Sequence, residues 1–136
     1  MNLRTAILAF VSVVFPVVAG AADLAFEREY NNRVRIELVK LGDDGSVPRE
    51  VHHWGYPLSV EGKSTASYDD IAAELIARGF VVQPAVVDGG IRLMHHAAVA
   101  GPAFDGLTGE LRDLFTEQGW DYDGWECQVL ENPLTG

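Results

Sequence analysis

The sequence predicts an α+β protein, a two-layer sandwich in which one antiparallel sheet holds the apolar faces of helices on one side. Three observations predict this class. Helical and β-favouring runs follow one another as helix, strand, helix, strand, strand, helix, strand. This order contains two split strand–helix–strand units, which build such a sandwich when both are right-handed. The chain has 136 residues, 48% of them hydrophobic, which is enough for one domain with a core.

Residues 1–22 have the pattern of a secretory signal peptide, which places the folded domain at residues 23–136. Arg4 is the only charged residue in this segment. The small residues Ala19-Gly20-Ala21 fit the cleavage pattern that follows the apolar run of such peptides. We therefore expect the protein to be periplasmic or secreted.

Two alternatives remain open for this segment. An uncleaved membrane anchor is one, although the apolar run Ala6–Val18 is shorter than the about 20 residues that a membrane span needs. A wrongly assigned start codon is the other, with the true protein starting near Asp23, and the protein would then be cytoplasmic. We expect no membrane span after signal cleavage.

The first helix is predicted over Leu24–Leu41, where apolar residues recur every three or four positions. The apolar stripe comprises Phe26, Tyr30, Val34, Leu38 and Leu41. Charged residues on the opposite side are predicted to be solvated: Glu27, Arg28, Arg35 and Glu37. We expect this additional helix to pack on the edge of the sheet or on its open face.

The first strand–helix–strand unit begins with an extended segment over Arg49–Val60. Gly55 and Pro57 interrupt this segment, which predicts a bulge or an edge position there. A helix then begins at Ser67, whose hydroxyl can cap it together with an acidic residue three positions later. Gly79 is expected to end this helix in a left-handed conformation.

A β-hairpin is predicted next, because a turn at Asp88-Gly89-Gly90 separates the runs Phe80–Val87 and Ile91–Val99. The third helix follows Gly101-Pro102 and is amphipathic. Its apolar face comprises Phe104, Leu107, Leu111, Leu114 and Phe115. The last strand is predicted over Trp120–Leu130. Its inward side comprises Trp125, Cys127 and Val129.

The charge balance limits the classes of partner. Ten basic residues against twenty acidic ones give a formal net charge of −10. Phosphate contacts need clustered lysine and arginine, so this balance argues against direct binding of nucleic acid. A partner is expected to be neutral or basic. The single cysteine, Cys127, excludes an internal disulfide, and its place on an apolar strand face indicates a buried, inert thiol.

Two histidine pairs are the first candidates for chemistry. His52-His53 lies in the first predicted strand of the sandwich, and His95-His96 lies in its expected antiparallel neighbour. Because side chains alternate, one imidazole of each pair could face the same side and share a zinc ion, with Glu50 or Glu126 as an oxygen ligand. The alternative is that each pair places one ring in the packing layer and one outside it. No helical metalloprotease motif and no paired cysteines occur, so we expect no metal and no cofactor.

The acidic residues of the last strand do not indicate an active site. Asp121, Asp123 and Glu126 lie within six residues, whereas the paired carboxylates of a glycosidase usually come from different elements around a cleft. No glycine-rich phosphate-binding motif occurs either. We therefore expect that the chain is not an enzyme. A small exported metal-binding or hydrolytic domain that uses the histidine pairs remains the alternative.

The most distinctive stretch is Gly119–Glu126, because its Tyr-Asp-Gly-Trp core directly follows an amphipathic helix near the end of a small α+β domain. Weaker pieces occur in the same order: Leu41-Gly42-Asp43, Pro48-Arg49, His52-His53 and Gly79-Phe80-Val81-Val82. Together they resemble the family called regulator of ribonuclease activity B (RraB), over a region from Leu38 to Val129.

This resemblance implies a ferredoxin-like βαββαβ sandwich, here with an extra N-terminal helix. It also implies a non-enzymatic protein that binds endoribonuclease E and inhibits it. Attraction between an acidic protein and a basic, RNA-binding partner would be the physical means. The signal peptide departs from the family, because an exported protein cannot meet a cytoplasmic ribonuclease. Its partner would then be a different protein, whereas a misassigned start codon would favour the ribonuclease.

The partner-binding residues that this interpretation names are Asp121, Tyr122, Asp123, Trp125 and Glu126. The Asp-Gly step would turn the chain so that the two aromatic side chains become anchors for a partner. The alternative is structural: Trp125 fills the core and Gly124 provides a bulge.

Overall fold

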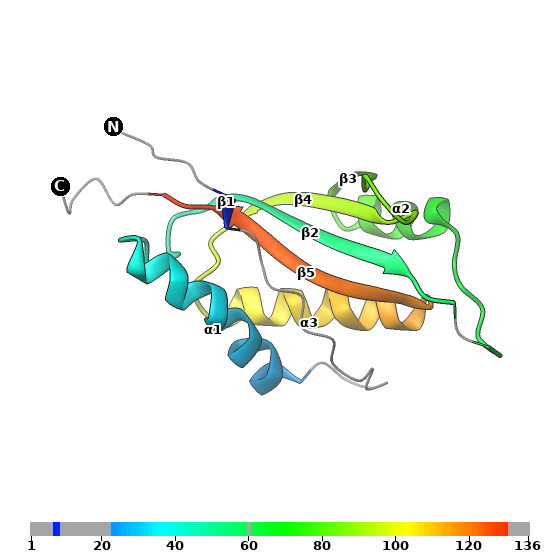
Figure 1. The fold of residues 1–136 in the computed structure, drawn as a ribbon, viewed down its shortest axis with the longest axis horizontal. Coiled ribbons are helices and arrows are strands. Elements are labelled where there is room, and N and C mark those ends of the chain that lie inside the picture. The colour runs from blue at the N-terminus through cyan, green and yellow to red at the C-terminus, as the bar shows by residue number, and fades with distance from the viewer. Residues whose placement is uncertain (1–6, 9–22, 60, 131–136) are drawn as a thin grey trace.

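The computed structural model describes residues 7–8, 23–59 and 61–130. They form an α+β domain with an antiparallel sheet and three helices (Figure 1). The elements in chain order are β1 (Ile7–Leu8), α1 (Leu24–Lys40), β2 (Arg49–Pro57), α2 (Tyr68–Ala77), β3 (Val81–Pro84), β4 (Ile91–Ala97), α3 (Pro102–Glu117) and β5 (Trp120–Gln128). Apart from β1, this is the predicted order. β1 lies within the predicted signal peptide, and the other residues of that segment lie outside the described part of the chain.

The sheet has the strand order β1-β5-β2-β4-β3, and each neighbouring pair is antiparallel. The predicted hairpin is confirmed as β3 and β4. β3 ends at Pro84, earlier than expected, since proline has no N–H with which to continue a ladder. β2 lies between β5 and β4 in the middle of the sheet, so the alternative of an edge position for its Gly55–Pro57 end is wrong.

The predicted bulge is confirmed, and it lies where β2 meets β5. Trp54 pairs with Gly124 and Gly55 pairs with Tyr122, which leaves Asp123 as the extra residue of β5. Gly124 has a φ of 99°, in the region that favours glycine. The extra residue changes which side chains of β5 share a face.

Gly55 allows α3 to lie close against β2. A Cβ at this position would overlap the Phe115 ring, so any larger residue would force the ring or α3 to move. The helix α2 has the predicted ends: the Ser67 hydroxyl accepts a hydrogen bond from the backbone N–H of Asp70, and Gly79 has a φ of 94°.

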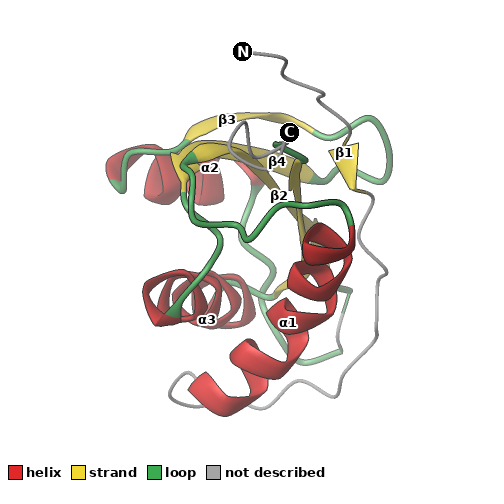
Figure 2. Ribbon diagram, turned by 90° about the vertical axis from the view of Figure 1, so that its left-hand side faces the viewer, coloured by secondary structure: helices red, strands yellow, loops and turns green. Residues whose placement is uncertain are grey.

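The three helices lie on one side of the sheet (Figure 2). Their apolar faces and the inward side chains of the strands form two core clusters. The first joins α2, α3 and the sheet through Ile71, Leu75, Leu93, Leu111, Phe115, Trp120 and Tyr122. The second joins α1 and the start of α3 to the sheet through Val34, Leu38, Val51, Phe104, Trp125 and Cys127.

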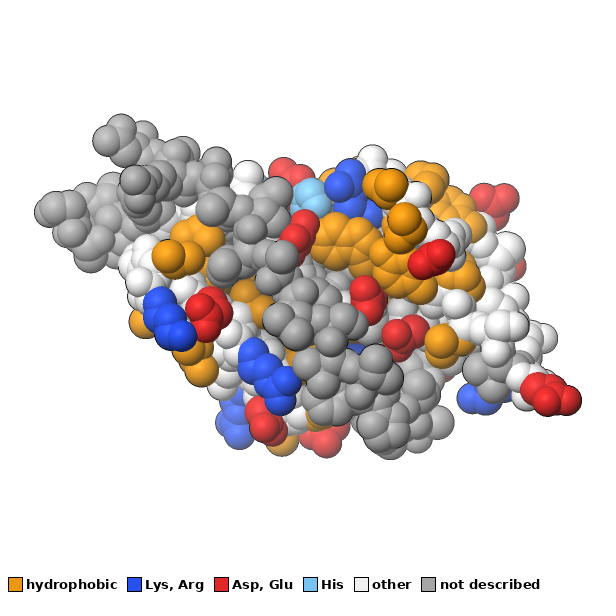
Figure 3. Space-filling model, viewed as in Figure 1, with side chains coloured by type: hydrophobic (Ala, Val, Ile, Leu, Met, Phe, Trp, Pro, Cys, Tyr) orange, Lys and Arg blue, Asp and Glu red, His pale blue; other side chains and the backbone are white. Residues whose placement is uncertain are grey.

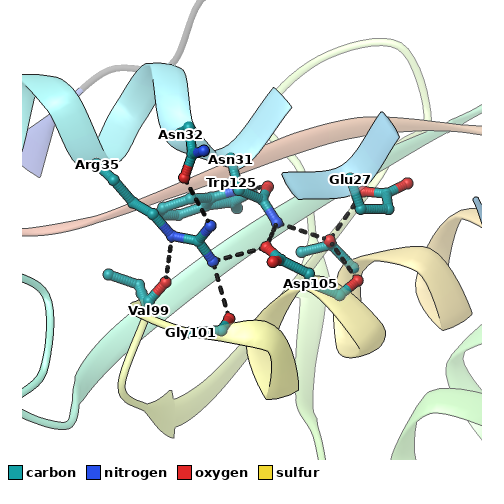
Figure 4. Close-up of polar contacts among 9 residues, drawn as sticks. Glu27, Asn31, Asn32, Arg35, Val99, Gly101, Asp105 and Trp125 are labelled. Carbon is teal, nitrogen blue, oxygen red and sulfur yellow. Dashed lines mark hydrogen bonds and ion pairs between the residues drawn. The ribbon is translucent and has the colours of Figure 1, made fainter. Parts of the chain in front are cut away.

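The expected place of the N-terminal helix is wrong. α1 packs beside α3 on the side of the sheet that the other helices also cover. The expectation of a solvated charged side is also wrong for Glu27 and Arg35. The Glu27 carboxylate is 1% exposed and accepts hydrogen bonds from Arg112 Nε and Thr108 Oγ1. Arg35 Nη2 lies 2.6 Å from the buried Asp105 carboxylate of α3 (Figure 4).

Candidate functional site

Four of the five expected partner-binding residues of β5 are divided between the two faces of the sheet, and the fifth, Asp123, is the extra residue of the bulge. Tyr122 and Trp125 point into the core and are 4% and 0% exposed, so the expectation that they are surface anchors is wrong. They share a face although they are three positions apart, because the bulge inserts an extra residue between them. The structural alternative, a core Trp125 with a bulge at Gly124, is confirmed.

Asp121 and Glu126 project from the opposite side, where the described helices do not pack. Asp121 pairs with Tyr56, and Glu126 pairs with His52, across the β2–β5 ladder. We call this side the outer face. It comprises Glu50, His52, Trp54, Tyr56, Val81, Gln83, Arg92, Met94, His96, Asp121, Glu126 and Gln128, as the strand registers place them.

The centre of the outer face is apolar and aromatic. Trp54 lies opposite Arg92, and His52 lies opposite Met94, across the β2–β4 ladder. The His52 and Trp54 rings lie 6.0 Å apart between centroids. Figure 3 shows hydrophobic side chains gathered over β2 and β4, with acidic side chains around them.

Acidic side chains surround this centre. The three carboxylates of Glu50, Asp121 and Glu126 share the outer face with one arginine, Arg92. His52 Nε2 lies 2.5 Å from Glu50 Oε1. A small hollow of about 90 Å³ lies beside this pair and is lined by Glu50, His52, Glu126, Cys127 and Gln128.

Partial burial raises the pKa of the two β5 carboxyl groups on the outer face. Partial desolvation raises the pKa of Asp121, and the nearby Asp123 charge raises it further. Partial desolvation also raises the pKa of Glu126, although His52 and Arg92 oppose that shift. Both groups would therefore gain from a cationic group placed next to them, because a nearby positive charge favours the ionised carboxylate.

The histidine pairs alternate between the faces as predicted: His53 and His95 share the inner face. The Nε2 atoms of these two residues lie 2.8 Å apart, and His53 Nδ1 lies 2.7 Å from the Tyr122 hydroxyl. His53 is 0% exposed and packs against Phe80 and Phe104. Burial lowers the pKa of His53 well below its usual value, and it lowers the pKa of His95 to about 4.

The metal-binding alternative finds two imidazoles on each face of the sheet: His53 and His95 on the inner face, and His52 and His96 on the outer face. The two carboxylates named for a zinc site, Glu50 and Glu126, lie on the outer face. The Nε2 atoms of His53 and His95 are turned toward each other within hydrogen-bonding distance. Within residues 7–8, 23–59 and 61–130, no group of three or more histidine, cysteine or acidic side chains is placed to hold a metal ion.

Cys127 is buried on the inner face, as predicted. Desolvation raises the pKa of its thiol to about 11, although the guanidinium of Arg49 beside it favours the thiolate. Arg49 itself is fully buried and binds the Asp43 carboxylate through Nη1 and Nη2, and the Gln128 carbonyl through Nη1. Arg49 therefore joins the end of β5 to Asp43, and the buried Cys127 thiol lies beside these contacts.

Sequence reasoning missed the aromatic centre of the outer face and the bond from Tyr122 to His53. The first had a signal in the period-two alternation of β2, in which Trp54 and Tyr56 lie two positions apart and therefore on one face. The second had none, because it depends on the bulge that turns Tyr122 inward.

In the part of the chain that the structure describes, no helix is both long and apolar enough to cross a membrane. No protein-family model matches the chain, and no curated protein is similar enough in sequence to stand as a relative.

Proposed function

We propose that this protein is a non-enzymatic regulator that binds a protein partner through the outer face of its sheet. The observation that carries this proposal is a sheet face without described helices on it, with an aromatic centre and acidic side chains around it. Interfaces are enriched in aromatic anchors, and exposed apolar patches with polar rims are typical binding sites.

The strand order supports a ferredoxin-like arrangement within this proposal. β2, α2, β3, β4, α3 and β5 follow one another as βαββαβ, with β2 and β4 in the centre. In this interpretation α1 is an addition at the N-terminus that extends the helical layer beside α3. In this arrangement the described helices cover one side of the sheet, and the other side would serve the partner.

The occupant that fits the outer face is a basic protein segment with an apolar centre. Its cationic side chains would lie next to Glu50, Asp121 and Glu126, and its apolar side chains would cover Trp54 and Met94. The net charge of −10 adds long-range attraction to such a segment. The same charge disfavours nucleic acid as a direct partner.

On the resemblance to regulator of ribonuclease activity B, we propose endoribonuclease E as the partner if the protein is cytoplasmic. If residues 1–22 are a cleaved signal peptide, the protein is periplasmic or secreted and the same face serves a different basic protein. The mass of the protein purified from its host, with the cell fraction that contains it, decides between these two cases.

The first experiment measures binding of the full chain to purified endoribonuclease E by calorimetry. We expect binding that weakens at least tenfold in the triple variant Glu50→Gln, Asp121→Asn, Glu126→Gln and in Trp54→Ala. The matched control is Glu74→Gln, because Glu74 is exposed on α2 and makes only a long surface ion pair with Arg78. Equal weakening in the control, or none in the variants, would contradict the outer face as the binding surface.

A further inference from the structure

A chain of three hydrogen-bonding side chains joins the three central strands across the inner face. Tyr122 from β5 contacts His53 from β2, and His53 contacts His95 from β4. Tyr122 and His53 are buried, whereas His95 is partly exposed at the other end. The ring of His53 also stacks on Phe104 at the start of α3 and lies edge-on to Phe80. The chain therefore lies where strands and helices meet.

The geometry restricts the number of protons that the three hydrogen-bonded side chains can hold. Each neutral imidazole carries one N–H, and the contact between the two Nε2 atoms needs one proton and one lone pair. Either His53 donates to His95 and accepts from the Tyr122 hydroxyl, or His95 donates to His53, which then donates to the Tyr122 oxygen. Both neutral arrangements satisfy both contacts.

Added protons act differently at the first and second step. The first can enter at His95 Nδ1, because His95 Nε2 still donates to His53 and both hydrogen bonds survive. The second would place N–H groups on both facing Nε2 atoms, which replaces the hydrogen bond with repulsion. It would also place a cation on the fully buried ring of His53, where nothing solvates it.

Charged groups around the three hydrogen-bonded side chains also affect the protonation of the two imidazoles. His52 on β2 acts on His53, and His96 on β4 acts on His95, each as a further positive charge once protonated. Arg112 from α3 lies 5.0 Å from the centroid of the Tyr122 ring and is paired with Glu27 from α1. Phe80 and Phe104, which pack against His53, carry no charge. The carboxylates of Glu27 and Asp123 act on the Tyr122 end of the network.

We propose that Tyr122, His53 and His95 form an acid-sensitive clamp, which holds β2, β4 and β5 against the start of α3 when neutral and opens the domain when both imidazoles are protonated. This device belongs to the fold and does not depend on the identity of any partner. Opening exposes His53, so that the ring takes up its proton in water and the packed state is lost.

The experiment follows the histidines of the full chain, labelled with ¹⁵N, by NMR between pH 8 and pH 4, together with the opening constant from amide hydrogen exchange. We expect His53 to stay neutral in the folded state. Burial lowers the pKa of His95 to about 4, so between pH 6.5 and 4 the folded state excludes the proton of His95 as well as that of His53. Because the open state binds both protons, the opening constant should rise by up to about 100-fold per pH unit in this range. Both imidazoles titrating near pH 6.5 in the folded state would overturn the clamp.

The variant His95→Gln isolates the contribution of one imidazole. Glutamine can still contact His53 Nε2 but takes up no proton. In this variant the opening constant should therefore rise by only about tenfold per pH unit. His96→Gln, on the exposed neighbouring position of β4, removes a nearby charge but no proton of the hydrogen-bonded pair, so it should leave the slope of the opening constant against pH unchanged. If His95→Gln does not fold, the imidazole titrations of the unaltered chain decide the question alone. The same slope in the unaltered chain and in His95→Gln would overturn the proposal.

Discussion

The indole Nε1 of Trp125 donates a hydrogen bond to Oδ1 of Asn31 over 2.8 Å, and this bond explains why the tryptophan of the distinctive β5 motif lies inside the protein. Asn31 comes from α1 and is 0% exposed. Its amide nitrogen donates to Asp105 and Thr108 of α3 (Figure 4). One buried amide therefore joins both helices to the sheet and satisfies a polar group of the core.

Replacing Asn31 by leucine should destabilise the domain by about 1–3 kcal/mol, because the Trp125 N–H and the Asp105 carboxylate would each lose a buried partner. Urea unfolding at pH 7 measures the change. Asn32→Leu is the matched control, since Asn32 is exposed on the same helix and binds only Arg35 at the surface. A loss of the same size in the control would show that the buried amide has no special role.

Replacing Gly55 by alanine should destabilise the protein by about 1–3 kcal/mol, because the new methyl group would overlap the Phe115 ring and force α3 away from β2. Thermal unfolding measures the change. Gly106→Ala in α3 provides the comparison: space is open there, and alanine should stabilise the helix by about 0.5–1 kcal/mol. Similar effects at both glycines would mean that the close approach of α3 is not rigid.

Replacing Asp43 by asparagine should cost about 3–5 kcal/mol at pH 7, since the fully buried guanidinium of Arg49 would lose its carboxylate. Burial alone would raise the pKa of Asp43, but hydrogen bonds from Arg49 and from the N–H groups of Leu130 and Gly45 hold it below its usual value.

The pH dependence of this ion pair has a definite sign. The folded pKa of Asp43 is below the unfolded one, so its stabilisation is complete above the unfolded pKa, near 3.8, and is lost as the pH falls through the folded value. The difference between the unaltered chain and Asp43→Asn should therefore shrink below pH 3.8. Glu74→Gln is the control, because Glu74 is exposed on α2 and makes a long surface ion pair with Arg78. A difference that stays constant down to pH 2 would contradict this account.

Cys127 should react slowly with thiol reagents in the folded protein. Burial raises its pKa to about 11, so little thiolate exists at pH 8, and the side chain is 2% exposed. Labelling with a maleimide, followed by mass spectrometry, measures the rate. The same chain in urea should react at the ordinary rate of a free cysteine. Equal rates in both conditions would mean that the packing around Arg49 and Cys127 opens readily.

The order and type of the main elements could be predicted from local patterns. The spacing of Tyr30, Val34 and Leu38 indicates a helix because a helix repeats every 3.6 residues, and the alternation of Trp125, Cys127 and Val129 indicates a strand because a strand repeats every two. The same alternation predicted that one histidine of each pair could share a face. The register between β2 and β4 decided that His53 and His95 do so on the inner face.

The charged side of α1 shows where such patterns fail. Glu27 lies opposite the apolar stripe, so periodicity predicts a solvated side chain. Arg112 and Thr108 of α3, more than eighty residues away in the sequence, provide the partners that allow its burial. A residue's own neighbours in the sequence carry no information about partners that only packing brings within reach.

By itself, the sequence determined where helices and strands lie, which residues of each strand could share a face, and the net negative charge of the protein. Only the tertiary structure decided which face the helices cover, and hence that Tyr122 and Trp125 are internal while Trp54 is on the outer face. The physical reason is that periodicity is a property of short segments. The inward turn of Tyr122 toward His53 depends instead on a bulge formed between strands that are far apart in the sequence.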